Sequence, residues 1–366
     1  MSKIIYGALA LLAGLAAYLL FWPVPVQPVA WTAPAAPGYQ GAHAANTRLA
    51  GLKLIQLPPG ETGPEHLVLG RDGKLYAAVA SGRILRMNPD GSAPEVYADT
   101  GGRVLGFDFD ADGRLIAADA VKGLLAVGTD RRVTVLTDKV ADDPIRYADA
   151  VVVARNGKIY FSDASARFAP AEWGGTFEAA VLDILEQRAT GRILEYDPAT
   201  QKTRVVVRGL SFPNGVALSP DERHLYVAET GRYRIWKVAV DAADLDAGAG
   251  PAQAQVLFDN LPGYPDNLMR GAEGRIWVGL SGPRSAKVDD MAGKPFLRAL
   301  TLRLPRALWP LPVPYGHVFA FDDSGRVVAD LQDPGGSYPQ TTGVTETADR
   351  LYLQNLHLGV LGWKAR

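Results

Sequence analysis

The chain has 366 residues, with 38 basic and 39 acidic side chains and 48% hydrophobic residues, so it is long enough to bury a large core in one domain. There is no basic excess of the kind used to bind nucleic acid, and we expect no nucleic-acid partner. The absence of cysteine excludes a disulfide framework, a thiol nucleophile and a cysteine-ligated zinc site.

The chain begins with an apolar run. Ile4 to Trp22 carry no charge, and about 19 apolar residues suffice for a membrane-spanning helix. Because Lys3 precedes the run, the positive-inside rule places the N-terminus in the cytoplasm. An uncleaved anchor is favoured over a signal peptide because the run is long and no small-residue cleavage site follows it directly. Residues 1–22 are predicted as a single-pass anchor, in the inner membrane of a bacterium, with the remaining chain on the non-cytoplasmic side.

Residues 23–46 are rich in proline and alanine, which predicts an extended linker that holds the next domain off the membrane. Residues 47–366 are predicted to form one further domain. Its first feature is a lone strand, Leu52 to Leu57, which we expect to complete the last, strand-poor segment at Val344 to Trp363 and to close a ring.

A short β-turn unit recurs along this domain. The stretch from Ser211 to Val238 contains three apolar runs separated by turn residues, which is typical of an antiparallel meander. Related units read RDGKLY, ADGRLI, RNGKIY, DERHLY, AEGRIW and TADRLY. Six copies, spaced by about 40 residues or more, indicate an all-β, six-bladed propeller.

One position of this repeat is rich in oxygen-bearing side chains. We compared the residue that lies about eleven or twelve positions before the last residue of each unit, a distance of about one innermost strand and its turn. These residues are Glu65, Leu105, Asp149, Asn214, Asp266 and Thr341 or Thr342. In a propeller this phase faces the central channel, where clustered oxygens suit a hard cation such as Ca²⁺. The same groups could instead bind turn backbone or channel water.

Two insertions interrupt the repeat. In residues 167–188, Phe177, Ala180, Val181, Ile184 and Leu185 follow helical spacing. Residues 286–314 carry Lys294, Arg298, Arg303 and Arg306 among apolar residues. We expect both insertions to cap one end of the propeller. The second could also contact anionic lipid, or it could simply pack on the ring.

Several blocks resemble the strictosidine synthase-like branch of the SMP-30/gluconolactonase superfamily of six-bladed propellers. They are GPEHLVLGRDGKLYAA, YADAVVVARNGKIYFSDAS, TGRILEYDPAT, PNGVALSPD with YVAET and RYRIWK, and LPGYPDNLMRGAEGRIWVGL. The resemblance covers roughly Leu49 to the C-terminus and implies metal ligands at Glu65, Asn214 and Asp266. The remaining ligand of the family is usually asparagine, whereas this chain has Asp149. The added charge requires a protonated carboxyl or a nearby base.

The resemblance implies a monomeric, metal-dependent hydrolase that acts on a small-molecule lactone or aryl ester. The expected cofactor is a divalent cation, most simply Ca²⁺, and Asp266 is the candidate catalytic base as well as a ligand. Strictosidine synthase activity is not expected, because the glutamate position of those enzymes falls at or beside Thr342. The alternative is a non-enzymatic ligand-binding propeller in which the metal is structural.

Overall fold

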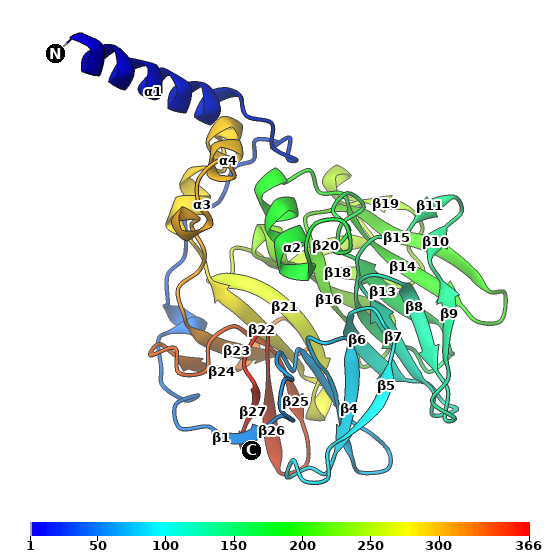
Figure 1. Ribbon diagram of the computed structural model, residues 1–366. Helices are drawn as coiled ribbons and strands as arrows, with labels where there is room; N and C mark the ends of the chain where they lie inside the picture. Colours follow the sequence, from blue (N-terminus) through cyan, green and yellow to red (C-terminus); the bar gives the residue numbers. More distant parts are fainter. Residues whose placement is uncertain (1) are drawn as a thin grey trace.

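A computed structural model describes residues 2–366, and strands dominate it (Figure 1). The described residues contain six sheets of four or five strands and a separate two-stranded ladder, β10 (Lys139–Val140) with β11 (Asp143–Pro144). The innermost strand of each sheet contacts the innermost strands of both neighbouring sheets, so the six sheets close a ring. The predicted all-β, six-bladed propeller with an N-terminal apolar helix is confirmed.

The blades are built alike, each as an antiparallel sheet. The innermost strands are β2 (His66–Leu69), β6 (Val104–Phe109), β12 (Ala148–Val153), β16 (Pro213–Leu218), β21 (Gly263–Arg270) and β25 (Thr341–Glu346). The second strands are β3 (Leu75–Ala78), β7 (Leu115–Asp119), β13 (Ile159–Asp163), β17 (His224–Glu229), β22 (Ile276–Pro283) and β26 (Arg350–Asn355). The third strands are β4 (Arg83–Met87), β8 (Gly123–Val127), β14 (Gly191–Asp197), β18 (Arg234–Ala239), β23 (Gly316–Phe321) and β27 (Val360–Ala365). The outer strands are β5 (Glu95–Asp99), β9 (Val133–Thr137), β15 (Lys202–Leu210), β20 (Ala254–Phe258), β24 (Val327–Asp333) and β1 (Lys53–Gln56), with β19 (Leu245–Asp246) added parallel to β15.

The repeated turn unit joins the innermost strand of a blade to the second strand. In the first blade, Gly73 adopts a φ of 73°, which favours glycine, and the Asp72 carboxylate accepts a hydrogen bond from the Lys74 amide at 3.1 Å. The strand that follows is fully buried between neighbouring blades. The polar turn and the apolar strand together account for the repeat in the sequence.

The ring is closed by a strand from the start of the domain, as predicted. Strand β1 pairs antiparallel with β27 in the last blade, with Ile55 opposite Leu361. The Ile55 side chain is buried, whereas that of Leu54 faces solvent. This pairing removes the exposed sheet edge that the last blade would otherwise present.

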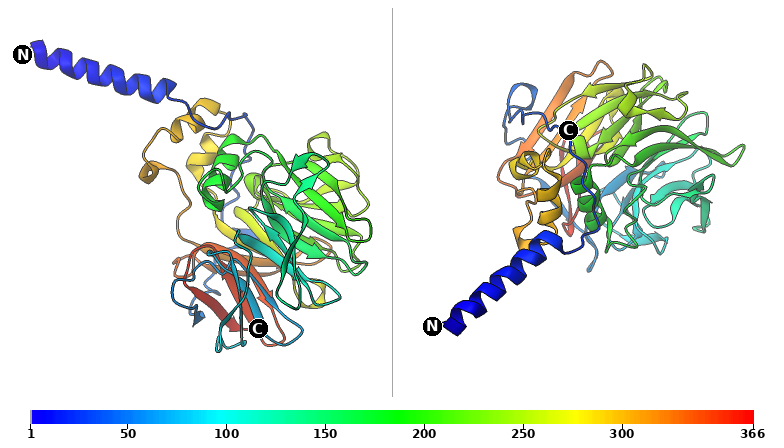
Figure 2. Two further views of the ribbon diagram at one scale, coloured as in Figure 1. Left: turned by 45° about the vertical axis from the view of Figure 1, so that its right-hand side comes forward. Right: turned by 90° about the horizontal axis from the view of Figure 1, so that it is seen from above.

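The helices gather on one side of the propeller (Figure 2). Helix α1 (Ser2–Phe21) projects away from the propeller, and none of its apolar window is buried in the protein. The first insertion contains the predicted helix as α2 (Thr176–Glu186), and the second insertion contains α3 (Ala286–Asp290) and α4 (Pro295–Thr301). Single 3-10 turns lie at Gly41–His43, Thr230–Arg232, Ala247–Ala249, Ala272–Gly274 and Arg306–Leu308.

The proline-rich linker is extended but packs on the domain that follows it. The Gln27 and Val29 amides donate to the side chain and the backbone carbonyl of Glu186 at 2.7 and 2.8 Å. Val26 is buried, and the Trp31 ring lies 6.3 Å from the Tyr233 ring. The linker therefore fixes the C-terminal end of α1 at the helical side of the propeller and does not act as a free spacer.

Candidate functional site

The oxygen-rich phase of the repeat coincides with irregular pairing in the innermost strands. The register shifts between Ala148 and Val151 around Asp149, between Pro213 and Val216 around Asn214, and between Pro265 and Leu268 around Asp266. Such irregularities bend a strand and change the direction of its side chains. All three side chains are buried and line one pocket, together with that of Glu65, which immediately precedes β2.

Small side chains bring the neighbouring inner strands close together at this level. A side chain on Gly215, directly after Asn214, would meet the Asp266 carbonyl oxygen at 2.3 Å. A side chain on Gly106 would meet the Asp149 carbonyl oxygen at 2.8 Å. The glycine of the PNG motif is therefore required by the approach of the next blade.

Hydroxyl and amide groups tie the same backbone segments across the blades. Thr342 Oγ1 and Asn267 Nδ2 donate to the Glu65 carbonyl oxygen at 2.8 and 2.9 Å. Ser162 Oγ donates to the Asn214 carbonyl oxygen at 2.7 Å. These bonds fix the backbone from which the four polar side chains project.

Burial and mutual repulsion act on the three carboxyl groups. Burial raises the pKa of Asp149 and of Asp266 well above the usual range, and the nearby Glu65 carboxylate raises both pKa values further. Burial also raises the pKa of Glu65, while Arg103 lowers it. A group of this kind is stable as a set of anions only with a positive charge beside it.

Arg103 supplies one such charge, and the sequence did not reveal it. Its guanidinium forms a salt bridge with Glu65 and also donates to the carbonyl oxygens of Val79 and Val104. Arg103 immediately precedes β6 and lies one blade away from Glu65. Because Leu105 occupies the oxygen-rich phase of that blade, the repeat contained no signal for a charged residue two positions earlier.

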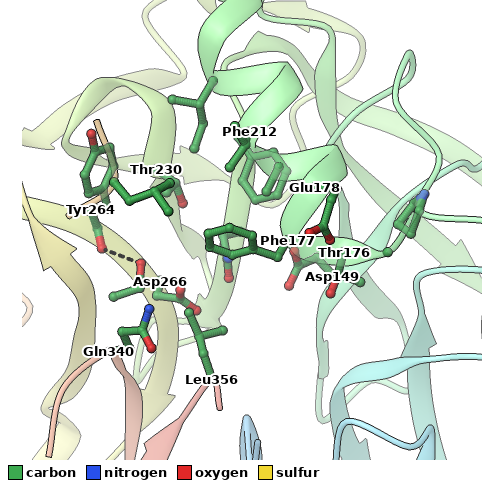
Figure 3. A pocket seen from close by; sticks show the side chains of 18 of the residues that line it. Asp149, Thr176, Phe177, Glu178, Phe212, Thr230, Tyr264, Asp266, Gln340 and Leu356 are labelled. Atoms are coloured by element: carbon green, nitrogen blue, oxygen red, sulfur yellow. Dashed lines mark hydrogen bonds between the residues drawn. The ribbon is translucent and has the colours of Figure 1, made fainter. Parts of the chain in front are cut away.

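The pocket that these residues line has a volume of about 460 Å³ and mostly apolar walls (Figure 3). Helix α2 forms one wall. Its five predicted apolar positions, Phe177, Ala180, Val181, Ile184 and Leu185, all line the pocket. Its opposite, buried side includes Ala179 and Leu182. The helical spacing was therefore predicted correctly, and the apolar stripe faces a cavity.

Two oxygen atoms in this pocket lack partners. Among the described residues, the buried atoms Asn214 Oδ1 and Asp266 Oδ1 have no hydrogen-bond donor within reach. Leaving a buried acceptor unpaired costs about 1–3 kcal/mol, so such atoms mark a place for a ligand, a water or an ion. Amide and carboxylate oxygens are the donor set that hard divalent cations prefer.

The side chains of Glu65, Asp149, Asn214 and Asp266 do not surround a single point closely. Among residues 2–366, the only group of three His, Cys, Asp or Glu side chains whose ligand atoms lie within 4.8 Å of one another is His43, His317 and Asp330. Glu65, Asp149 and Asp266 thus share the pocket without meeting that closely. Asp149, Asn214 and Asp266 offer oxygens of the kind that hard cations bind, while Glu65 pairs with Arg103.

The second cluster lies outside the pocket and fastens the linker to the fifth blade. His43 Nδ1 and His317 Nε2 each lie 2.8 Å from Asp330 Oδ2, and because a carboxylate only accepts, both nitrogens carry hydrogen. Asn46 and Gln332 donate to Asp330 Oδ1 at 2.9 and 2.6 Å. Four donors satisfy this carboxylate, which explains its lowered pKa.

Comparison with known proteins agrees with this architecture. The model of the SMP-30/gluconolactonase/LRE-like region matches residues 71–298, and the model of the strictosidine synthase-like N-terminal region matches residues 41–87. The chain belongs to the SMP-30/gluconolactonase family. The resemblance predicted from the sequence blocks is thereby confirmed.

The chain is similar in sequence to plant and animal proteins of this family and in structure to a bacterial one. STRICTOSIDINE SYNTHASE-LIKE 7 of Arabidopsis thaliana is 32% identical over 76% of this chain and 72% of its own. Adipocyte plasma membrane-associated protein of Rattus norvegicus is 29% identical over 85% of both chains. The solved gluconolactonase of Xanthomonas campestris aligns with 94% of this chain and 99% of its own, with 19% identity and a TM-score of 0.61. The structural likeness shows a shared fold.

Proposed function

We propose that this protein is a divalent-metal-dependent hydrolase of lactones or aryl esters. The observation that carries the proposal is the pair of buried, unpartnered oxygens, Asn214 Oδ1 and Asp266 Oδ1, at an apolar pocket that also contains Asp149. Two similar folds support it, because one is a gluconolactonase and another, from Agrobacterium tumefaciens, is described as the calcium-binding protein regucalcin, with a TM-score of 0.52.

The charge of the site suits a divalent ion. Arg103 offsets one of the three carboxylate charges, and a divalent cation would offset the other two. Asp149, Asn214 and Asp266 would hold the ion, and Glu65 would join them on leaving Arg103. Ca²⁺ is the preferred candidate because all of these ligands are oxygens. When bound, the ion would polarise the substrate carbonyl and make water a better nucleophile.

The chain's own groups can then carry the reaction. Asp266, whose free Oδ1 is in the pocket, accepts a proton from water as the water oxygen bonds to the carbonyl carbon. The ester or lactone C–O bond then breaks, and the proton passes to the leaving oxygen. The apolar face of α2, with Phe177 beside the carboxylates in Figure 3, binds the substrate and keeps bulk water out.

The geometry gives no support to a strictosidine synthase reaction. The Thr342 hydroxyl, at the position of the expected glutamate, donates its hydrogen to the Glu65 carbonyl oxygen. A threonine held in this way is no base at neutral pH. The remaining alternative is a ligand-binding propeller in which the cation only fixes the channel.

A panel of lactones and aryl esters, offered to the full chain before and after chelation, tests the proposal. We expect hydrolysis that is lost with chelator and restored by Ca²⁺. Asp266→Asn should abolish it, whereas Asp149→Asn, which restores the common family residue, should retain measurable activity with weaker metal affinity. If the wild-type chain hydrolyses no compound of the panel with Ca²⁺ present, the enzymatic assignment is wrong and the binding propeller is the better account. If Asp266→Asn hydrolyses the panel at the wild-type rate, Asp266 is not the base.

We also propose that α1 anchors the protein in a membrane with the propeller on the non-cytoplasmic side. The helix is long and apolar enough to span, and the linker after it is built into the domain surface. A cleaved signal peptide would remove α1 alone, so the intact mass of the purified chain distinguishes the two cases.

A further inference from the structure

The second insertion ends in an exposed apolar loop. Residues 305–314 read PRALWPLPVP, with Arg306 as the only charged side chain. Leu308 and Val313 are 63% and 66% exposed. Phe296 and Leu297 of α4, in the same insertion, are also exposed. We call residues 296–297 and 305–314 the apolar rim. Several exposed apolar side chains gathered in one insertion indicate an interaction site.

The apolar rim is joined to the end of the membrane helix. Arg303 Nε donates to the Trp22 carbonyl oxygen at 2.8 Å, directly after α1. Leu302 packs in the same cluster as Val24 of the linker. In Figures 1 and 2, α4 lies beside the inner end of α1. Because Arg303 is hydrogen-bonded to the residue that follows α1, the loop that begins two residues later starts close to the end of the apolar helix.

The basic residues of this insertion do not form the lipid-contacting face that the sequence allowed. Arg298 is buried and donates to the Leu185 and Ala292 carbonyl oxygens, both at 3.0 Å. Arg306 pairs with Glu178 of α2 at 2.7 Å. Arg298, Arg303 and Arg306 therefore bind the protein, and Lys294 is the basic residue of this set that stays exposed beside the apolar side chains.

The same loop forms a wall of the pocket. Trp309, Pro310, Leu311 and Pro312 line it together with Glu65, Arg103 and Asp149. The Trp309 indole nitrogen is engaged with the Leu304 carbonyl oxygen at 3.1 Å, which holds the ring in the loop. The apolar rim and the pocket therefore share residues 309–312.

We propose that the apolar rim inserts into the surface of the bilayer and that the pocket receives amphiphilic esters or lactones from the lipid phase. This substrate class rests on the proposed hydrolase function and on α1 as an anchor. An acyl chain would pass along the rim and lie against the apolar stripe of α2, with its ester group among the channel carboxylates. The partner is a lipid surface, recognised through burial of apolar side chains.

Because the chain has no cysteine, single labels can report on the rim directly. Leu308→Cys and Val313→Cys in the full chain, placed in phosphatidylcholine nanodiscs, would each carry an environment-sensitive fluorophore. Val135→Cys is the matched control, since Val135 is 57% exposed and lies on β9, far from α1. We expect brominated phosphatidylcholine to quench the labels at 308 and 313 and to leave the label at 135 unquenched.

Equal quenching at all three positions would overturn the proposal. So would efficient disulfide cross-linking of two chains of the Leu308→Cys or Val313→Cys variant in detergent, because a second copy would then cover the rim. For the substrate class, Leu308→Asp should lower the ratio of long-chain to short-chain ester hydrolysis about tenfold, which is the factor that corresponds to the free energy of burying one apolar side chain. Val135→Asp should leave this ratio unchanged. If no ester is hydrolysed by the wild type or by any variant, the hydrolase proposal fails. The quenching result would still show whether the apolar rim inserts into the bilayer.

Discussion

At the scale of single residues, Arg103 offsets the charge of one of the three acids that line the channel. The bridge between Arg103 and Glu65 is nearly enclosed, with side-chain exposures of 13% and 9%. Burial and Glu65 raise the pKa of Asp149, and the guanidinium of Arg103 lowers it. The residue lies outside the oxygen-rich phase of the repeat, so only the folded chain brings it to Glu65.

Removing this arginine should destabilise the protein strongly. Arg103→Met leaves Glu65 buried without a partner, which we expect to lower the free energy of unfolding by about 3 kcal/mol in metal-free buffer. Adding Glu65→Gln should recover much of the loss. Arg208→Met, which breaks the exposed pair with Asp244, should cost less than about 1 kcal/mol. Urea unfolding of the wild type and of these three variants measures the changes, and equal losses for Arg103→Met and Arg208→Met would contradict this account.

A second buried carboxyl group, Asp183 of α2, should make stability depend on pH. Burial raises its pKa to about 7, and Ser165 Oγ donates to it at 2.6 Å. Because the folded state holds the proton more tightly than the unfolded state, the stability from this proton is complete below about pH 4 and is lost as pH rises to about 7. Asp183→Asn should therefore raise the melting temperature at pH 8 relative to wild type.

The same substitution should make little difference at pH 4, where the wild-type carboxyl group is already protonated. Melting curves of both proteins across this range would show the two temperatures converging as the pH falls. A constant difference at all pH values would mean that the substitution acts through packing and not through ionisation.

At the scale of elements, the strand that closes the ring offers a matched test. Ile55 and Leu54 are neighbours on β1, with exposures of 6% and 52%. Ile55→Ala should lower the free energy of unfolding by about 3 kcal/mol, because it opens a cavity between β1 and the first blade. Leu54→Ala should change it by less than about 0.5 kcal/mol. Similar effects of both substitutions would show that packing of β1 through Ile55 does not stabilise the closed ring.

The elements also show what the sequence could and could not predict. Turn residues and apolar runs are local signals, so the six blades, the closing strand and helix α2 were predicted correctly. The sequence could not predict that the apolar stripe on α2 faces a cavity, because apolar residues line cavities and cores alike. The hydrogen bonds of His43 and His317 to Asp330 could not be predicted either, because His43 and Asp330 are 287 positions apart and no local pattern indicates the contact.

At the scale of the whole molecule, the channel unites residues from four blades. Glu65 precedes the first blade, and Asp149, Asn214 and Asp266 come from the third, fourth and fifth. Their common phase in the repeat predicted that they would share one pocket, and they do. An ion held between them would link blades that otherwise contact only their neighbours, so binding would stabilise the entire ring.

Calorimetric titration of the metal-free full chain with Ca²⁺ tests the central claim most directly. We expect one ion per chain, no binding by Asp266→Asn, and a gain in stability of about 2.7 kcal/mol at a hundredfold excess over the dissociation constant. A titration without heat and without any rise in melting temperature would contradict the account. Binding that survives in Asp266→Asn would place the ion elsewhere in the protein.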